Sequence, residues 1–124
     1  MLFRSARTDE MTGLLNRKYF YEVLNEEFEK NKDSSLALAI INVDDFKLYN
    51  QLYGIKEGDV CLQHIAAIIR SSVGDSGYIA RHGGKEFAVL LPKYDLFSAR
   101  NLVESIAKQI FVMNNRRTDR KSVV

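Results

Sequence analysis

Residues 78–91 read YIARHGGKEFAVLL, two apolar segments of β-favouring residues on either side of a polar turn. Gly83 and Gly84 stand together in that turn, and Lys85 and Glu86 follow them. Glycine reaches backbone conformations that strain other residues, so the pattern predicts a β-hairpin. Because glycine has no side chain, the pair would also let a ligand come close to the backbone. Most turns of this kind only connect strands, so the surrounding chain decides between a connector and a binding loop.

The segments around this hairpin predict helices and one further strand. An uninterrupted apolar run over residues 36–43 is typical of a central strand that is covered on both faces. Asp95 is placed to cap a helix that follows the hairpin. Apolar residues at helical spacing predict helices over residues 18–31, residues 46–53, residues from 57 onward and residues 96–114. The first of these helices would bury Phe20, Val23, Leu24 and Phe28. Elements of both types around one sheet place the chain in the α/β (α+β) class.

The composition is that of a single globular domain. The 124 residues are 46% apolar and 27% charged. No apolar run is long enough for a membrane-spanning helix, and the N-terminus lacks the apolar block of a signal peptide. The single cysteine, Cys61, excludes an internal disulfide and lies in an apolar helical pattern, which favours buried packing over a role as nucleophile. We therefore expect a cytoplasmic domain.

The formal net charge of +2 is unevenly distributed. The four basic residues between positions 116 and 121, less Asp119, give this end a charge of +3, and the other 14 basic and 15 acidic residues nearly balance. A basic tail can contact nucleic acid or a membrane, but this one is short and has no interleaved aromatic residues. We expect a solvated end, no nucleic-acid partner and no membrane contact by this domain.

Four short motifs follow one another along the chain. They are DEMTGLLNR at residues 9–17, NVDDFK at residues 42–47, NQLYGIKEGD at residues 50–59 and RHGGKEF at residues 81–87. Together and in this order they resemble the motifs of the GGDEF family, the catalytic domains of diguanylate cyclases. On this resemblance, residues 1–8 are the end of an upstream linker or helix, and residues 9–124 are the GGDEF-like domain. That domain would lack the final strands and helix of the family, with residues 122–124 as the start of a strand.

The resemblance implies a palm-like nucleotidyl-cyclase fold, in which helices wrap a central mixed sheet and the glycine turn lies at the site. Active members bind GTP with Mg²⁺, and two subunits condense two GTP molecules into cyclic di-GMP. The metal-binding positions of the family correspond to Asn42 and Val43, and the catalytic positions of its signature turn correspond to Lys85 and Glu86. The nucleotide-binding positions correspond to Phe46, Lys47, Asn50, Asp59, Gly83 and Gly84.

Two of these positions carry residues that oppose metal binding. Asn42 stands where the family has an aspartate, and Lys85 stands where it has an acid. An ammonium group has only hydrogen-bond donors and cannot ligate Mg²⁺, which requires oxygen ligands. The two changes also make the local charge more positive, and repulsion at a few ångströms would cost on the order of several kcal/mol. We therefore expect Mg²⁺ to bind weakly or not at all, and catalysis to be lost or severely weakened.

Nucleotide recognition is better retained than metal binding. Asn50 and Asp59 together offer the donors and acceptors that guanine requires, although both residue types also favour helix capping. The turn glycines would cradle phosphates, and Lys85 is either a counter-charge for them or a solvated turn lysine. His82 and His64 have no second ligand near them in the sequence, so metal binding by either is not expected.

These observations predict a GTP-binding or partner-regulating module without cyclase activity, within a larger bacterial cyclic di-GMP signalling protein. The module would pair with a second copy of itself or with a partner GGDEF or EAL domain. Two alternatives stay open at this point. One is a working diguanylate cyclase, and the other is an interaction scaffold that binds no nucleotide.

Overall fold

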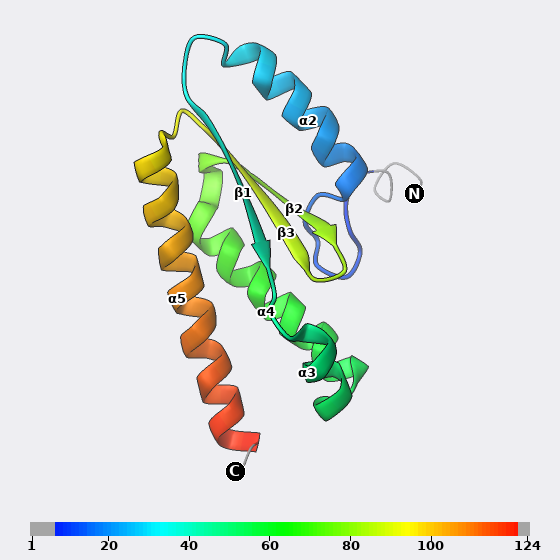
Figure 1. Ribbon diagram of the computed structural model, residues 1–124. Coiled ribbons are helices and arrows are strands. Elements are labelled where there is room, and N and C mark those ends of the chain that lie inside the picture. Colours follow the sequence, from blue (N-terminus) through cyan, green and yellow to red (C-terminus); the bar gives the residue numbers. More distant parts are fainter. Residues whose placement is uncertain (1–6, 122–124) are drawn as a thin grey trace.

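The computed structural model of the chain describes residues 7–121, with side chains described up to residue 114 (Figure 1). The elements are α2 (Arg17–Lys30), β1 (Leu36–Asn42), α3 (Phe46–Tyr53), α4 (Ile55–Val73), a 3-10 turn (Gly74–Ser76), β2 (Tyr78–Gly83), β3 (Glu86–Pro92) and α5 (Leu96–Lys121). The expected helices, strand and hairpin are therefore confirmed, with α5 longer than predicted. The expectations for residues 1–6 and 122–124 lie outside the described residues.

The three strands form one antiparallel sheet in the order β1-β3-β2 (Figure 1). Along β1, the register runs from Leu36 opposite Pro92 to Asn42 opposite Glu86. The α+β class is confirmed. The family resemblance implied a mixed sheet, with parallel as well as antiparallel pairs. Within residues 7–121, parallel pairing is limited to one isolated bridge between Leu15 and Ala80.

Alternating residues of the sheet belong to two cores on its opposite faces. Ala80, Ala88 and Leu90 face α2, which buries Phe20 and Val23 against them. The other face packs on α4 and α5. The second core, formed between this face and the two helices, buries Ile65, Ile69, Ile79, Phe87, Val89, Leu91 and Ile106. Cys61 belongs to this second core, as predicted. The sheet is therefore a middle layer between α2 on one side and the helices α4 and α5 on the other (Figure 1).

Strand β1 differs from the expectation that it is central and covered on both faces. Among the strands of residues 7–121 it pairs with β3 alone, and Leu38 and Ile40 on its α2 side are 50% and 49% exposed. The cause is the position of α2, whose buried residues pack over β2 and β3 and leave the same face of β1 open. An apolar run has the same appearance at an edge as at the centre of a sheet, so its sequence could not reveal this difference.

The buried face of α2 also differs from the prediction at one position. Phe28 is 64% exposed, and Glu27 occupies the buried face instead, with only 8% exposure. The carboxylate of Glu27 accepts hydrogen bonds from Tyr78 Oη at 3.1 Å and Asn31 Nδ2 at 3.2 Å, which makes its burial tolerable. Burial, followed by the hydrogen bond to Glu27, raises the pKa of Tyr78 above its ordinary value.

The predicted cap of α5 is confirmed. Asp95 Oδ1 accepts a hydrogen bond from the backbone N–H of Ser98 at 2.7 Å, and this bond lowers the pKa of the Asp95 carboxyl. No helix in the described part of the chain is long and apolar enough to cross a membrane.

Replacing Tyr78 by phenylalanine should weaken the α2 layer. The variant loses the hydrogen bond to Glu27 and should be about 1 kcal/mol less stable at neutral pH. Because the pKa of Tyr78 is raised in the folded state, the unfolded chain loses the phenolic proton first, so this contribution to stability disappears as the pH rises above about 10. Urea unfolding at neutral and alkaline pH should show a smaller alkaline loss of stability in Tyr78→Phe than in the wild type. Equal losses would contradict this assignment.

Gly77 and Gly84 form a matched pair for a test of packing. A Cβ added to Gly77 would overlap the carbonyl oxygen of Leu90, which is backbone and cannot move aside cheaply. A Cβ added to Gly84 would have nothing within 4 Å. Gly77→Ala should therefore cost about 1–3 kcal/mol in the free energy of unfolding, and Gly84→Ala should stay within about 0.5 kcal/mol of the wild type. Similar unfolding curves for the two variants would refute this packing argument.

Candidate functional site

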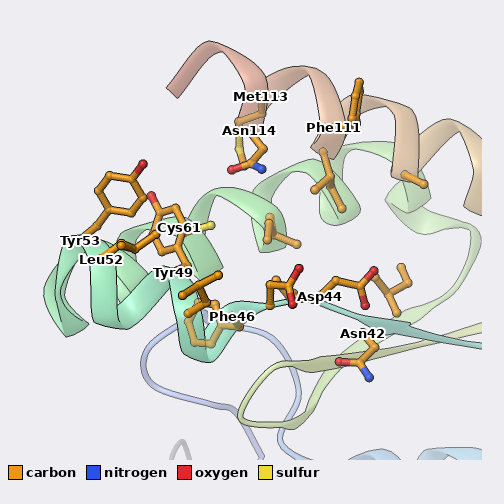
Figure 2. Close-up of a pocket in the computed structure, with 17 residues that line it drawn as sticks. Asn42, Asp44, Phe46, Tyr49, Leu52, Tyr53, Cys61, Phe111, Met113 and Asn114 are labelled. Carbon is orange, nitrogen blue, oxygen red and sulfur yellow. The ribbon is translucent and has the colours of Figure 1, made fainter. Parts of the chain in front are cut away.

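The end of β1 and the glycine turn lie side by side. Asn42 is the register partner of Glu86, and the backbone N–H of Val43 donates to the carbonyl oxygen of Lys85 at 2.9 Å. We call Asn42, Val43 and residues 83–86 the turn subsite. Figure 2 shows the Asn42 amide pointing away from α5, on the opposite side of β1 from Asp44. The structure therefore brings the predicted metal positions next to the predicted catalytic positions.

Arg81 fixes the shape of the turn. Its guanidinium donates to the carbonyl oxygens of Gly84 at 2.9 Å and Gly83 at 3.3 Å, and it forms an ion pair with Asp9 at 3.5 Å. Asp9 also accepts hydrogen bonds from the backbone and hydroxyl of Thr12. These contacts connect the turn to the loop that precedes α2. Arg81 belongs to the fourth sequence motif, but nothing in the sequence indicates these contacts.

Glu86 is fixed by a histidine that the sequence analysis considered only as a metal ligand. His82 Nδ1 lies 3.0 Å from Glu86 Oε1, and His82 Nε2 lies 2.7 Å from the hydroxyl of Tyr21 in α2. His82 stands at an irregularity in the β2–β3 register, between Arg81 and Gly83. A bulge of this kind re-aims a side chain, and here the His82 ring contacts both the turn and α2. No local sequence signal connects Tyr21 with His82, because 61 residues separate them.

The reason for the glycine pair differs from the one predicted. Neither Gly83 nor Gly84 has a positive φ, so the turn does not require glycine for its backbone conformation. A Cβ at Gly83 would make only ordinary contacts with Glu86, and a Cβ at Gly84 would lie in open space. The folded chain therefore has no internal need for glycine here. The second predicted reason, close approach of a ligand to the backbone, agrees with this open space.

A second group of predicted residues lies where α3 meets α4. A Cβ on the buried Gly58 of α4 would overlap Asn50 Oδ1 and would lie 3.2 Å from Phe46 Cζ, so these two α3 side chains pack directly on Gly58. Asn50 Oδ1 is buried and has no hydrogen-bond partner among the described residues. Asp59, which follows Gly58, is exposed. We call Phe46, Asn50, Gly58 and Asp59 the α3–α4 subsite.

The alternative role of Asn50 and Asp59 as helix caps is not supported. The cap of α3 is Asp45 and the cap of α4 is Gly54, and neither provides a side-chain capping bond. Asn50 and Asp59 each lie more than one turn after the first residue of their helices. Their side chains therefore do not cap the helix N-termini.

The residues of the turn subsite do not fit a Mg²⁺ site. Within the described part of the chain, no group of three or more His, Cys, Asp or Glu side chains could hold a metal ion. At this subsite Lys85 provides only donors, and one carboxylate oxygen of Glu86 is already hydrogen-bonded to His82. Mg²⁺ needs several oxygen ligands in octahedral geometry, which Asn42 and Val43 alone do not supply.

A hollow of about 460 Å³ lies between the end of β1 and the helices α3, α4 and α5 (Figure 2). Its walls are mainly apolar, with Tyr49, Ile65, Ile110 and Phe111 among them. Asn42, Val43 and Phe46 also line it, whereas Lys47, Asn50, Asp59 and the turn residues 83–86 do not. This hollow therefore overlaps the predicted site only at its edge.

Comparisons with known proteins agree with the motifs. The family model described as "Diguanylate cyclase, GGDEF domain" matches residues 6–123. The diguanylate cyclase DgcP of Pseudomonas aeruginosa is 38% identical over 109 residues, which are 86% of this chain and 16% of that protein. The diguanylate cyclase DgcM of Escherichia coli K12 is 38% identical over 111 residues, which are 85% of this chain and 26% of that protein. The chain thus spans about a quarter or less of the length of these two relatives.

Solved structures give the same result for the fold. The GGDEF domain of DgcB from Caulobacter crescentus, solved in complex with c-di-GMP, matches with a TM-score of 0.79 and 30% identity, over 82% of this chain and 58% of that chain. The GGDEF domain of FimX from Pseudomonas aeruginosa matches with a TM-score of 0.79 at 23% identity, over 83% of this chain and 65% of that chain. On the family model, the relatives and the fold together, this chain belongs to the GGDEF domain family of the diguanylate cyclases.

Proposed function

We propose that this GGDEF domain binds a guanine nucleotide without condensing it into cyclic di-GMP, and that it serves as a GTP-sensing or partner-regulating module of a larger bacterial signalling protein. The observation that carries the proposal is the chemistry of the turn subsite. Asn42 and Lys85 lie next to each other where the reaction of the family needs acidic metal ligands. In this proposal the domain works with a second copy or with a partner GGDEF or EAL domain.

The side chains of the turn subsite do not provide the metal ligands that catalysis needs. Attack by a 3′-hydroxyl on a triphosphate needs a metal to lower the pKa of the hydroxyl and to neutralise charge on the phosphates. An ammonium group can do the second but cannot act as a metal ligand. The one carboxylate of the turn, Glu86, is hydrogen-bonded to His82 and belongs to no group of three or more His, Cys, Asp or Glu side chains that could hold a metal ion among the described residues.

Nucleotide binding is supported by the α3–α4 subsite. A buried polar atom without a hydrogen bond costs roughly 1–3 kcal/mol, so Asn50 Oδ1 destabilises the chain unless a water molecule or a ligand donates to it. The N–H groups of guanine are donors of that kind, and the exposed carboxylate of Asp59 offers further acceptors nearby. Gly58 is required for this arrangement, because any side chain at that position would displace Asn50.

A working diguanylate cyclase is the second candidate function. It is favoured by the relatives, since DgcP and DgcM, each 38% identical to this chain, are both named as diguanylate cyclases. The two candidates share nucleotide binding and differ in turnover, so one set of samples distinguishes them.

We expect GTP to bind to the wild-type domain in a calorimetric titration, and cyclic di-GMP to be undetectable by chromatography after incubation with Mg²⁺ or Mn²⁺. Asp59→Ala should weaken GTP binding by roughly 10-fold or more, because it removes a charged acceptor for the base. Asp75→Ala is the matched control, since Asp75 is an exposed acid in the 3-10 turn after α4. Metal-dependent product would establish the cyclase instead, and no binding of GTP under any condition would leave an interaction scaffold.

Gly84→Ala tests whether a ligand approaches the turn backbone. The added methyl group meets nothing within the chain, so the fold should be unchanged, but it would occupy the space in which a phosphate approaches. GTP affinity should fall by roughly 10-fold, while the melting temperature stays within a few degrees of the wild-type value. Unchanged GTP affinity in a folded Gly84→Ala variant would show that the turn is only a connector.

A further inference from the structure

Tyr21, His82 and Glu86 form a hydrogen-bonded series that runs from α2 to the β2–β3 hairpin. The Tyr21 hydroxyl lies 2.7 Å from His82 Nε2, and His82 Nδ1 lies 3.0 Å from Glu86 Oε1. The Tyr21 and His82 rings also contact each other edge to face, with their centroids 5.7 Å apart. Neither Tyr21 nor His82 takes part in the proposed function.

The order of these contacts determines which nitrogen of His82 carries the proton. The ionised carboxylate of Glu86 has only acceptors, so Nδ1 donates to it. In the neutral imidazole the other nitrogen is then an acceptor, so Nε2 accepts from the Tyr21 hydroxyl. A nucleophile, a base that can take its proton and a carboxylate that orients the base therefore follow one another, which is the arrangement of an activated hydroxyl nucleophile.

Tyr21 is accessible to reagents in solution. It is 42% exposed, whereas the other five tyrosines of the chain are half-buried. The His82 side chain is only 17% exposed. The nucleophile is therefore open to solvent, while the base behind it is largely shielded from water.

Basic side chains beside Tyr21 favour a negatively charged reaction partner. The Arg17 guanidinium lies 6.0 Å from the centre of the Tyr21 ring. Lys18 precedes Tyr21 by three residues, which places both on one side of α2. Arginine and lysine bind the oxygens of phosphoryl groups. The Glu86 carboxylate does not contact the hydroxyl, because it is hydrogen-bonded to the other nitrogen of His82.

We propose that Tyr21 is a nucleophile that accepts a phosphoryl group from an activated donor, a phosphorus(V) compound with a good leaving group. Tyr21 Oη forms a bond to phosphorus, the bond from phosphorus to the leaving group breaks, and the leaving group departs with the electron pair. The hydroxyl proton passes to His82 Nε2 and then to solvent. His82 is the general base and Glu86 is a positioning residue.

Modification at Tyr21 would also change how α2 contacts the hairpin. The phosphorylated oxygen has no proton to donate to His82 Nε2, so the hydrogen bond between the two elements is lost. The reaction uses neither the guanine nucleotide nor a metal ion. It is therefore independent of the proposed function and goes beyond it.

The test is covalent labelling with an alkyl fluorophosphonate, in EDTA and without nucleotide, followed by mass spectrometry of the peptides. Fluoride is the leaving group of this probe. Wild-type protein should be labelled at Tyr21 and much more slowly at Tyr53, whose ring packs on Tyr49. Tyr21→Phe should abolish the adduct at this position. His82→Gln should lower the maximal labelling rate by about 100-fold, because its amide can accept the hydroxyl hydrogen bond but cannot take the proton.

Glu86→Gln tests the positioning role. Glutamine keeps the shape of the side chain, but its amide can present a donor to Nδ1 and thereby favour the wrong tautomer of His82. The maximal labelling rate should fall by roughly 10-fold or more. The probe concentration that gives half of this rate should stay unchanged, because Glu86 does not contact the probe. His64→Gln is the matched control, since His64 is an exposed histidine in the middle of α4.

Absence of an adduct on Tyr21, equal labelling of Tyr21 and Tyr53, or equal rates for wild type and folded His82→Gln would overturn the inference. An unchanged rate in Glu86→Gln would overturn the positioning role. Circular dichroism of each variant establishes that a change of rate is not caused by unfolding. GTP binding is measured separately by calorimetry, so a failure of this inference and a failure of the proposed function are distinguishable.

Discussion

The antiparallel pairing of β1 with β3 is the constraint on which the rest of the domain depends. It sets Asn42 opposite Glu86 and places Val43 against the carbonyl of Lys85, so the turn subsite exists only in this register. A shift by one residue would turn the apolar residues of β3 to the wrong faces, because successive side chains of a strand alternate. The packing of two cores on the sheet therefore fixes the site without any contact to a ligand.

Much of the fold was predictable because its signals are local. The hairpin, the short helix after β1 and the Asp95 cap each depend on residues close together in the chain. What the sequence could not provide was coverage by distant elements. The apolar run of β1 did not show that α2 would leave Leu38 and Ile40 exposed. The helical spacing of Phe28 did not show that Glu27 would be buried beside Tyr78 in its place.

The sequence motifs identified the residues of the candidate site, but they did not predict which distant residues contact them. The motifs identified the positions at the turn and at α3, and the structure brings them into two subsites. The contacts that fix them were not predictable, because they join residues far apart in sequence, such as Tyr21 with His82. Of the two reasons predicted for the glycine pair, the backbone conformation is wrong, because neither glycine has a positive φ. The other reason, close approach of a ligand, agrees with the open space over Gly84.

The pairing of β1 with a strand far along the chain has a consequence for how the domain assembles and comes apart. The β2–β3 hairpin closes through a turn of two residues, whereas pairing of β1 with β3 must enclose α3, α4 and β2. Contacts between distant residues form later in folding because closing a long loop costs more entropy. We therefore expect Asn42 to join Lys85 late in folding and to leave it early in unfolding, while the hairpin and its arginine contacts remain formed.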